Sequence, residues 1–97
     1  MAAVAFYRGG SSLAPRRGEL RFDPLTGDVL PTHGVSVFDR PDGLDRFGGA
    51  YRLNNVPDTL RIIHRGRDPH HHEIEPAFPM PRDEYEKALA GIVLTPA

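Results

Sequence analysis

The sequence has no cysteine among its 97 residues. Disulfide bonds, thiolate metal sites and cysteine nucleophiles are therefore excluded together. No apolar run approaches the roughly 20 residues that a transmembrane helix needs. The first residues also lack the basic start and long apolar centre of a signal peptide. From these absences we expect a protein of the cytoplasm, with no membrane partner.

The chain also lacks a large excess of charge of either sign, because it has 12 basic and 13 acidic residues and a net charge of -1. Such a balance gives no strong field that would draw the chain to nucleic acid or to a membrane. Among the basic residues only Lys87 is a lysine. Arginine suits bidentate contacts with phosphate or carboxylate groups, although a coding bias toward arginine would give the same enrichment.

Glycine and proline are plentiful, with ten of each, so turns should be many and long helices few. Alternating or β-branched stretches predict strands, and apolar spacing of three and four predicts one helix. We expect the apolar stripe of this helix to pack against the rest of the chain and not to form a site. The last apolar stretch, 92–94, is either a strand or the end of that helix. We therefore expect one domain over residues 1–97, of the α+β class and mostly β. The expected strands are 4–8, 34–40, 50–53, 59–65 and 70–75, with short strands near 19–22 and 28–30, and the expected helix is 83–91.

The stretch 34–40 has the clearest alternation in the chain. In a strand it would direct Val35 and Val37 to one face and Ser36 and Phe38 to the other. A small hydroxyl beside an aromatic ring can form the floor for a flat ligand ring. The same pattern is also typical of a core strand with one hydrogen-bonded serine, and the alternation does not separate the two interpretations.

The histidines of 70–72 do not predict a metal site, because consecutive strand residues face opposite sides and cannot bind one ion together. A small histidine metalloprotein, in which His33 or His64 adds a ligand, is the weakest alternative, because nothing in the spacing requires it. His71 would share its face with Glu73 and Glu75. A carboxylate beside an imidazole suits general acid and base chemistry near neutral pH. A polar strand side that faces solvent is the alternative interpretation.

Several common motifs are absent. The glycine pairs at 9–10 and 48–49 are too short to form a phosphate-binding glycine loop. Ser36 lacks the flanking glycines of a hydrolase elbow. The turn at 23–28 lacks the final glutamate of a calcium loop.

Five pieces of the chain, in order, resemble the Tse-two type of bacterial toxin, an effector family exported by type VI secretion. The most specific piece is Gly-Val-Ser-Val-Phe-Asp-Arg at 34–40. The others are Tyr-Arg at 7–8, Pro-Asp-Thr-Leu at 57–60, His71, and Pro-Ala-Phe-Pro-Met at 76–80. The resemblance spans nearly the whole chain.

That family is similar in fold to the mono-ADP-ribosyltransferase toxins, in which a β-sandwich splits around an NAD site. The resemblance thus implies a small ADP-ribosyltransferase-like domain that uses NAD and modifies an unknown acceptor. It also implies an intracellular toxin neutralised by a cognate immunity or antitoxin protein. Such a toxin would act in the cytoplasm of the producer or of a target cell, and a type VI system would export it without a signal peptide.

The resemblance also implies a cofactor-binding set. An arginine of the first strand, matched here by Arg8 next to Tyr7, would hold the phosphate or ribose of NAD. Ser36 matches the hydroxyl that supports the nicotinamide side, with Phe38 beside it to stack on the ring. The family has a second hydroxyl residue before this serine, where this chain has Val35.

The third family motif usually contributes a glutamate that stabilises the ribosyl cation. The matching residue here is His71, and Glu73 and Glu75 are the nearby carboxylates. The expected catalytic set is therefore Ser36, His71, Glu73 and Glu75. The missing glutamate keeps a second function open, that of a non-enzymatic binding toxin or a small binding module.

Overall fold

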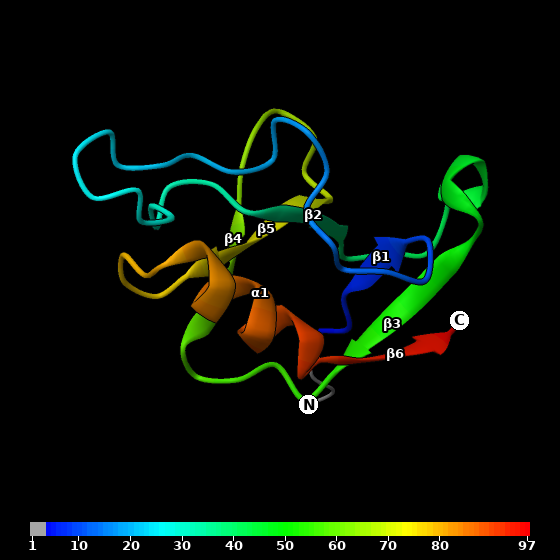
Figure 1. Ribbon diagram of the computed structural model, residues 1–97. Helices are drawn as coiled ribbons and strands as arrows, with labels where there is room; N and C mark the ends of the chain where they lie inside the picture. The colour runs from blue at the N-terminus through cyan, green and yellow to red at the C-terminus, as the bar shows by residue number, and fades with distance from the viewer. Residues whose placement is uncertain (1–3) are drawn as a thin grey trace.

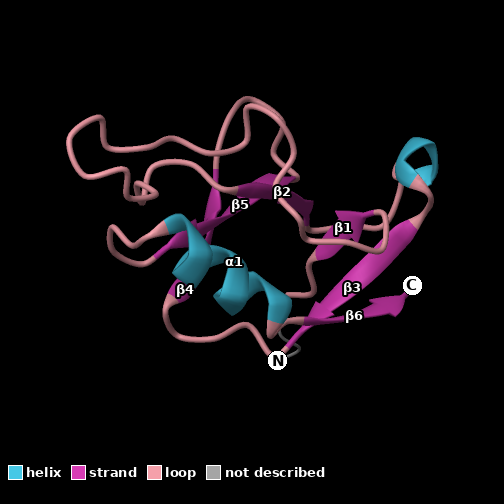
Figure 2. Ribbon diagram, viewed as in Figure 1, coloured by secondary structure: helices cyan, strands magenta, loops and turns pink. Residues whose placement is uncertain are grey.

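An antiparallel sheet of six strands forms most of the computed structural model, which describes residues 4–97. One α-helix packs on the sheet and a single 3-10 turn interrupts a loop (Figure 2). The prediction of an α+β protein that is mostly β is confirmed. The elements are β1 (Tyr7–Gly9), β2 (Val35–Phe38), η1 (Asp45–Phe47), β3 (Ala50–Asn54), β4 (Leu60–His64), β5 (His71–Pro76), α1 (Arg82–Ala90) and β6 (Val93–Pro96).

The sheet has the strand order β4-β5-β2-β1-β3-β6, and it divides between its two central strands (Figure 1). Only Tyr7 and Phe38 are aligned between β1 and β2. In contrast, β2 and β5 are aligned over four consecutive pairs. The sheet therefore consists of a half with β4, β5 and β2 and a half with β1, β3 and β6. All six strands nevertheless belong to one hydrogen-bonded sheet.

Helix α1 covers one face of the sheet (Figure 1). Its residues Tyr85 and Leu89 are four positions apart, so they lie on one side of the helix, and both are buried. The predicted packing role of this apolar stripe is confirmed, because these residues belong to the same core as the apolar residues of β2 and β5. That core comprises Leu13, Leu20, Val29, Val35, Val37, Leu53, Leu60, Ile74, Met80, Tyr85, Leu89 and Ile92.

The buried hydroxyl of Tyr85 links β2 to β5. It donates a hydrogen bond to the Ile74 carbonyl at 2.6 Å and accepts one from the Val35 amide at 3.1 Å. Burial raises the pKa of Tyr85 far above its ordinary value, so the phenol stays protonated. Gly34 approaches the same carbonyl so closely that a Cβ there would lie 1.9 Å from the Ile74 oxygen. Only glycine fits at this position.

Several predicted element ends differ from the observed ones. The first strand was predicted at 4–8 but begins at Tyr7, and Val4 is 67% exposed. The central strand ends at Phe38, since the amide of Asp39 bonds to His70 outside the strands. The two short strands predicted near 19–22 and 28–30 reduce to isolated bridges of Val29 with Phe22 and with Met80. Segment 92–94 lies at β6, which is a strand and not an extension of the helix.

The turn predicted at 23–28 is confirmed, with the Asp23 carboxylate accepting the Leu25 amide at 2.8 Å. The first three residues, part of the signal-peptide expectation, lie outside the described residues. Within residues 4–97, α1 is too short and too polar to cross a lipid bilayer.

Replacing Gly34 by alanine should destabilise the fold. The added methyl would collide with the backbone of β5, and overpacking of this kind costs about 1–3 kcal/mol. Urea unfolding measures the change. Gly91→Ala is the matched control, because its Cβ would lie at an ordinary 3.4 Å from the nearest atom. Equal stability of the two variants would contradict the close approach.

Candidate functional site

Strands β2 and β5 bring most of the predicted catalytic residues onto one face of the sheet. Ser36 is aligned with Glu73, and Phe38 is aligned with His71. Directly opposed residues of an antiparallel pair point to the same side. The side chains of these four residues therefore project from the face opposite Val35 and Val37, which belong to the core under α1. The predicted alternation is thus confirmed for residues 35–38 of the stretch 34–40.

Ser36 and His71 form a hydrogen-bonded pair on this face. The Ser36 Oγ lies 3.0 Å from the His71 Nε2, and the His71 Nδ1 lies 2.8 Å from the Arg65 carbonyl oxygen. A carbonyl only accepts, so the Nδ1 carries a proton and donates it. In the neutral imidazole the Nε2 is then an acceptor, and the Ser36 hydroxyl donates to it.

Aromatic rings lie beside this pair. The Phe38 and His71 rings meet edge to face, with centroids 5.5 Å apart and planes at 64°. Tyr7 is aligned with Phe38 across the division of the sheet, so it projects to the same side. All three side chains are half-buried. Two aromatic rings thus accompany the serine and the imidazole, as a site for a flat ring requires.

The two carboxylates of β5 have different surroundings. Glu73 is half-buried and its Oε1 accepts the Gly34 amide at 3.0 Å. Glu75 is fully buried, and Arg65 donates two hydrogen bonds to it at 2.7 and 2.9 Å. The solvent-facing interpretation of this strand side does not hold for Glu75. Of the two carboxylates, Glu73 is the one aligned with Ser36.

Arg8 is 1% exposed, and its guanidinium is saturated with hydrogen bonds inside the chain. An arginine has five N–H donors. Those of Arg8 go to the carbonyls of Ser12, Ser36 and Ala14 and to both oxygens of Glu19, at 2.8–3.3 Å. Arg8 therefore contacts the backbone of Ser36, but it has no N–H left for the phosphate that the resemblance assigned to it.

The direction in which the Arg8 side chain points also argues against a contact with the phosphate of NAD. Neighbouring strand residues face opposite sides, so Arg8 points away from the face of Tyr7 and toward the α1 side. The structure thus brings Ser36 and His71 together side chain to side chain. It joins Arg8 to them only through the Ser36 carbonyl, at 2.8 Å.

Glu19 completes this arrangement, and the sequence pattern did not identify it. Its Oε2 accepts the Arg8 Nη1 at 2.9 Å and the Ser36 amide at 3.0 Å, and its Oε1 accepts the Arg16 amide at 2.6 Å. Arg8 and Glu19 therefore bond both backbone groups of Ser36 where β1 supplies no ladder partner. Burial alone would raise the pKa of Glu19, but the hydrogen bonds from Arg8, Arg16 and Ser36 lower it overall.

The remaining histidines of 70–72 have separate partners. His70 lies 2.7 Å from the Asp39 carboxylate. The ring of His72 meets those of Phe6 and His64 edge to face, at centroid distances of 4.9 and 5.5 Å. Among residues 4–97, no three histidine, cysteine, aspartate or glutamate side chains are arranged to hold a metal ion.

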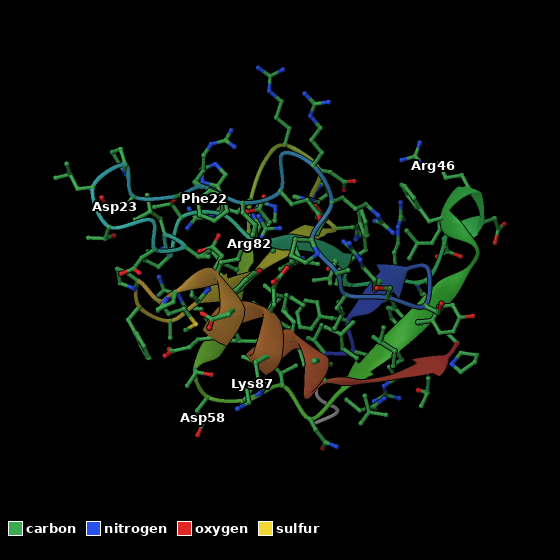
Figure 3. The ribbon with its side chains drawn as sticks, viewed as in Figure 1. Phe22, Asp23, Arg46, Asp58, Arg82 and Lys87 are labelled. Carbon is green, nitrogen blue, oxygen red and sulfur yellow. The ribbon has the colours of Figure 1, made fainter. Side chains whose placement is uncertain are left out.

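Two more arginines lie at the end of β1. The guanidinium carbons of Arg16 and Arg46 are 4.9 and 4.8 Å from the centre of the Phe47 ring. A Cβ on Gly9 would meet that ring at 2.6 Å. Gly9 faces the same side as Tyr7, two residues before it. The Phe47 ring therefore packs against the end of β1, and Figure 3 shows Arg46 beside the turn with η1.

A cavity of about 500 Å³ lies elsewhere, between the segment 11–15 and the elements α1 and β6. Seven of the ten residues that line it are apolar, and Glu86 is the single titratable residue among them. Neither Ser36 nor His71 contributes to this lining. The cavity has few groups that could act on a substrate, so we assign the chemistry to the Ser36 face.

The lowered pKa of Glu19 predicts a loss of stability in acid. A carboxyl whose pKa is lower in the folded state stabilises the fold above its unfolded pKa, and this contribution disappears as the pH falls through the folded value. We expect the free energy of unfolding to decline below about pH 4.5, the ordinary value for Glu19. Urea unfolding between neutral and acid pH measures this decline.

Glu19→Gln should remove part of that pH dependence. It should also lower the stability at neutral pH by roughly 3 kcal/mol, because the buried Arg8 loses its counter-charge. Glu86→Gln is the control, since Glu86 is an exposed partner of Arg82. If Glu19→Gln keeps the acid dependence of the parent, the role of Glu19 is wrong.

No family model, no curated protein and no solved structure matches the chain.

Proposed function

We propose that the chain is an intracellular toxin that uses NAD in the manner of the ADP-ribosyltransferases, and that a cognate immunity or antitoxin protein neutralises it. The observation that carries the proposal is the Ser36–His71 hydrogen bond, next to two aromatic side chains, at the line where the sheet divides. The resemblance of 34–40 to the toxin family favours the same function.

The residues of this face fit much of the dinucleotide. Tyr7 and Phe38 offer rings for stacking, and Ser36 offers a hydroxyl to the nicotinamide amide. The phosphates need a cation other than Arg8, whose donors are all engaged. Arg16 and Arg46 stack on Phe47 at the end of β1, so we assign the phosphate contacts to them.

NAD supplies an ADP-ribosyl group with nicotinamide as the leaving group, and positive charge develops on the ribose as the bond breaks. A nearby carboxylate stabilises such charge, as it does in glycoside cleavage. Glu73 has this role in the proposal, because it is aligned with Ser36 while Glu75 is paired with Arg65. His71 would accept the Ser36 hydrogen bond at its Nε2 and so fix the direction of the hydroxyl oxygen that meets the nicotinamide amide.

A second candidate function is binding without catalysis, in which the toxin blocks a target by occupying it. The saturation of Arg8 and Glu75 favours this candidate, because two of the groups expected to act on NAD serve the fold instead. The histidine in place of the family glutamate favours it as well. Incubation of the purified protein with NAD separates the two functions.

Substitutions on the Ser36 face should abolish toxicity. We expect growth arrest on cytoplasmic expression of the parent, and normal growth with Ser36→Ala, His71→Gln or Glu73→Gln. Release of nicotinamide by the purified variants should fall about 100-fold, the range lost with a general acid or base. Ser11→Ala, the same change at an exposed serine, is the control.

Circular dichroism and urea unfolding must first show that each variant folds. Arrest by all three variants, with normal folding, would refute the assignment of the site. Arrest by the parent without NAD binding or cleavage would favour the second candidate.

The assignment of the phosphates predicts that Arg46→Ala weakens NAD binding about tenfold. That loss corresponds to one charge-assisted hydrogen bond of at least about 1.4 kcal/mol. Isothermal titration calorimetry measures the affinity. Lys87→Ala removes the same charge from α1, on the other side of the sheet (Figure 3), and should leave the affinity unchanged. Equal losses in the two variants would indicate a general effect of charge and contradict a phosphate contact at Arg46.

A further inference from the structure

The hydrogen bonds of His71 fix the direction of proton transfer between it and Ser36. The Nδ1 donates to the Arg65 carbonyl at 2.8 Å, which leaves the lone pair of the Nε2 directed at the Ser36 Oγ, 3.0 Å away. A nucleophile, a base within hydrogen-bond reach and a third group that orients the base are the features of an activated serine. Here a backbone carbonyl is the third group.

The backbone around the pair is held from several directions. Glu19 bonds the Ser36 amide and Arg8 bonds its carbonyl, at 3.0 and 2.8 Å. The Phe38 ring contacts His71 on its edge. Side chains on strands with such support keep their positions better than side chains on loops. Ser36 and His71 are both only half-buried, so part of each residue is in contact with solvent.

From this geometry we infer that Ser36 is a nucleophile, activated by His71, that reacts with electrophilic phosphoryl and acyl centres. This activity goes beyond the proposed use of NAD and does not depend on it. Although the sequence lacks the glycines of a hydrolase elbow, the fold places Ser36 against a base by pairing β2 with β5. The pairing is a long-range contact that no local motif reveals.

The step can be written for a fluorophosphonate. The Ser36 Oγ attacks phosphorus, the Oγ–P bond forms and the P–F bond breaks. Fluoride leaves with the bonding electron pair, and the hydroxyl proton passes to the His71 Nε2, which becomes an imidazolium. No oxidant, reductant or metal is needed. The product is a stable phosphonyl ester of Ser36, so the step can be followed by mass.

The chain offers an internal comparison, because its only other serines are Ser11 and Ser12. Both are exposed. The Ser12 Oγ accepts the Ala14 amide at 3.0 Å, and no imidazole nitrogen bonds either hydroxyl among the described contacts. A serine without a base reacts slowly with fluorophosphonates, whereas one with a base reacts fast.

In the test, the full chain is incubated with an alkyl fluorophosphonate and the mass of the intact protein is followed over time. The modified residue is then identified by peptide mapping. We expect a single adduct, on Ser36, formed at least about 100-fold faster than in His71→Gln. Ser36→Ala should form no adduct, and Ser11→Ala should react like the parent. Equal rates in the parent and in a folded His71→Gln would overturn the inference.

The parent alone also tests the inference if His71→Gln fails to fold. Peptide mapping then compares Ser36 with Ser11 and Ser12 in the same molecule, and no labelling, or equal labelling of the three, would overturn it. NAD binding by the parent is measured separately. If NAD binds but Ser36 stays unlabelled, only the nucleophile is refuted; if Ser36 is labelled but NAD does not bind, only the proposed function is refuted.

Discussion

The ion pair between Arg8 and Glu19 is the contact on which the rest of the structure depends. It lies where β1 and β2 separate, and there the backbone groups of Ser36 lack ladder partners. Buried peptide groups without partners are costly. Glu19 accepts the Ser36 amide while Arg8 donates to its carbonyl, so the two side chains replace the missing strand. The ion pair can be buried at this position because every N–H donor of Arg8 has an acceptor.

The two faces of the sheet have different roles, because one packs against α1 and the other carries the candidate site. On one face α1 packs over an apolar core, and the Tyr85 hydroxyl bridges a backbone amide of β2 and a backbone carbonyl of β5. On the other face Ser36, Phe38, His71 and Glu73 are polar or aromatic and only half-buried. The packing on the first face makes the strands rigid, and rigid strands hold Ser36 and His71 at hydrogen-bonding distance on the second.

Alternation and helical spacing were enough to predict much of this arrangement. The pattern of 34–40 placed Ser36 and Phe38 on one face, and the apolar stripe of α1 was predicted to pack, as it does. The partner of each charge could not be predicted. Glu19 comes from a loop without periodicity, and Arg65 reaches Glu75 across the turn between two strands. Such contacts depend on where the strands pair in space, so the burial of Arg8 was also missed, and an expected ligand contact became a structural one.

The central proposal is that NAD binds at the Ser36 face and not in the cavity between segment 11–15, α1 and β6. A titration with NAD, followed by the chemical shifts of the backbone amides, tests it most directly. The account predicts that the shifts change at Ser36, Phe38 and His71 and along the turn with Arg46, while those of α1 stay constant. Changes confined to the cavity lining around 11–15 and 86–94, or no changes at saturating NAD, would contradict it.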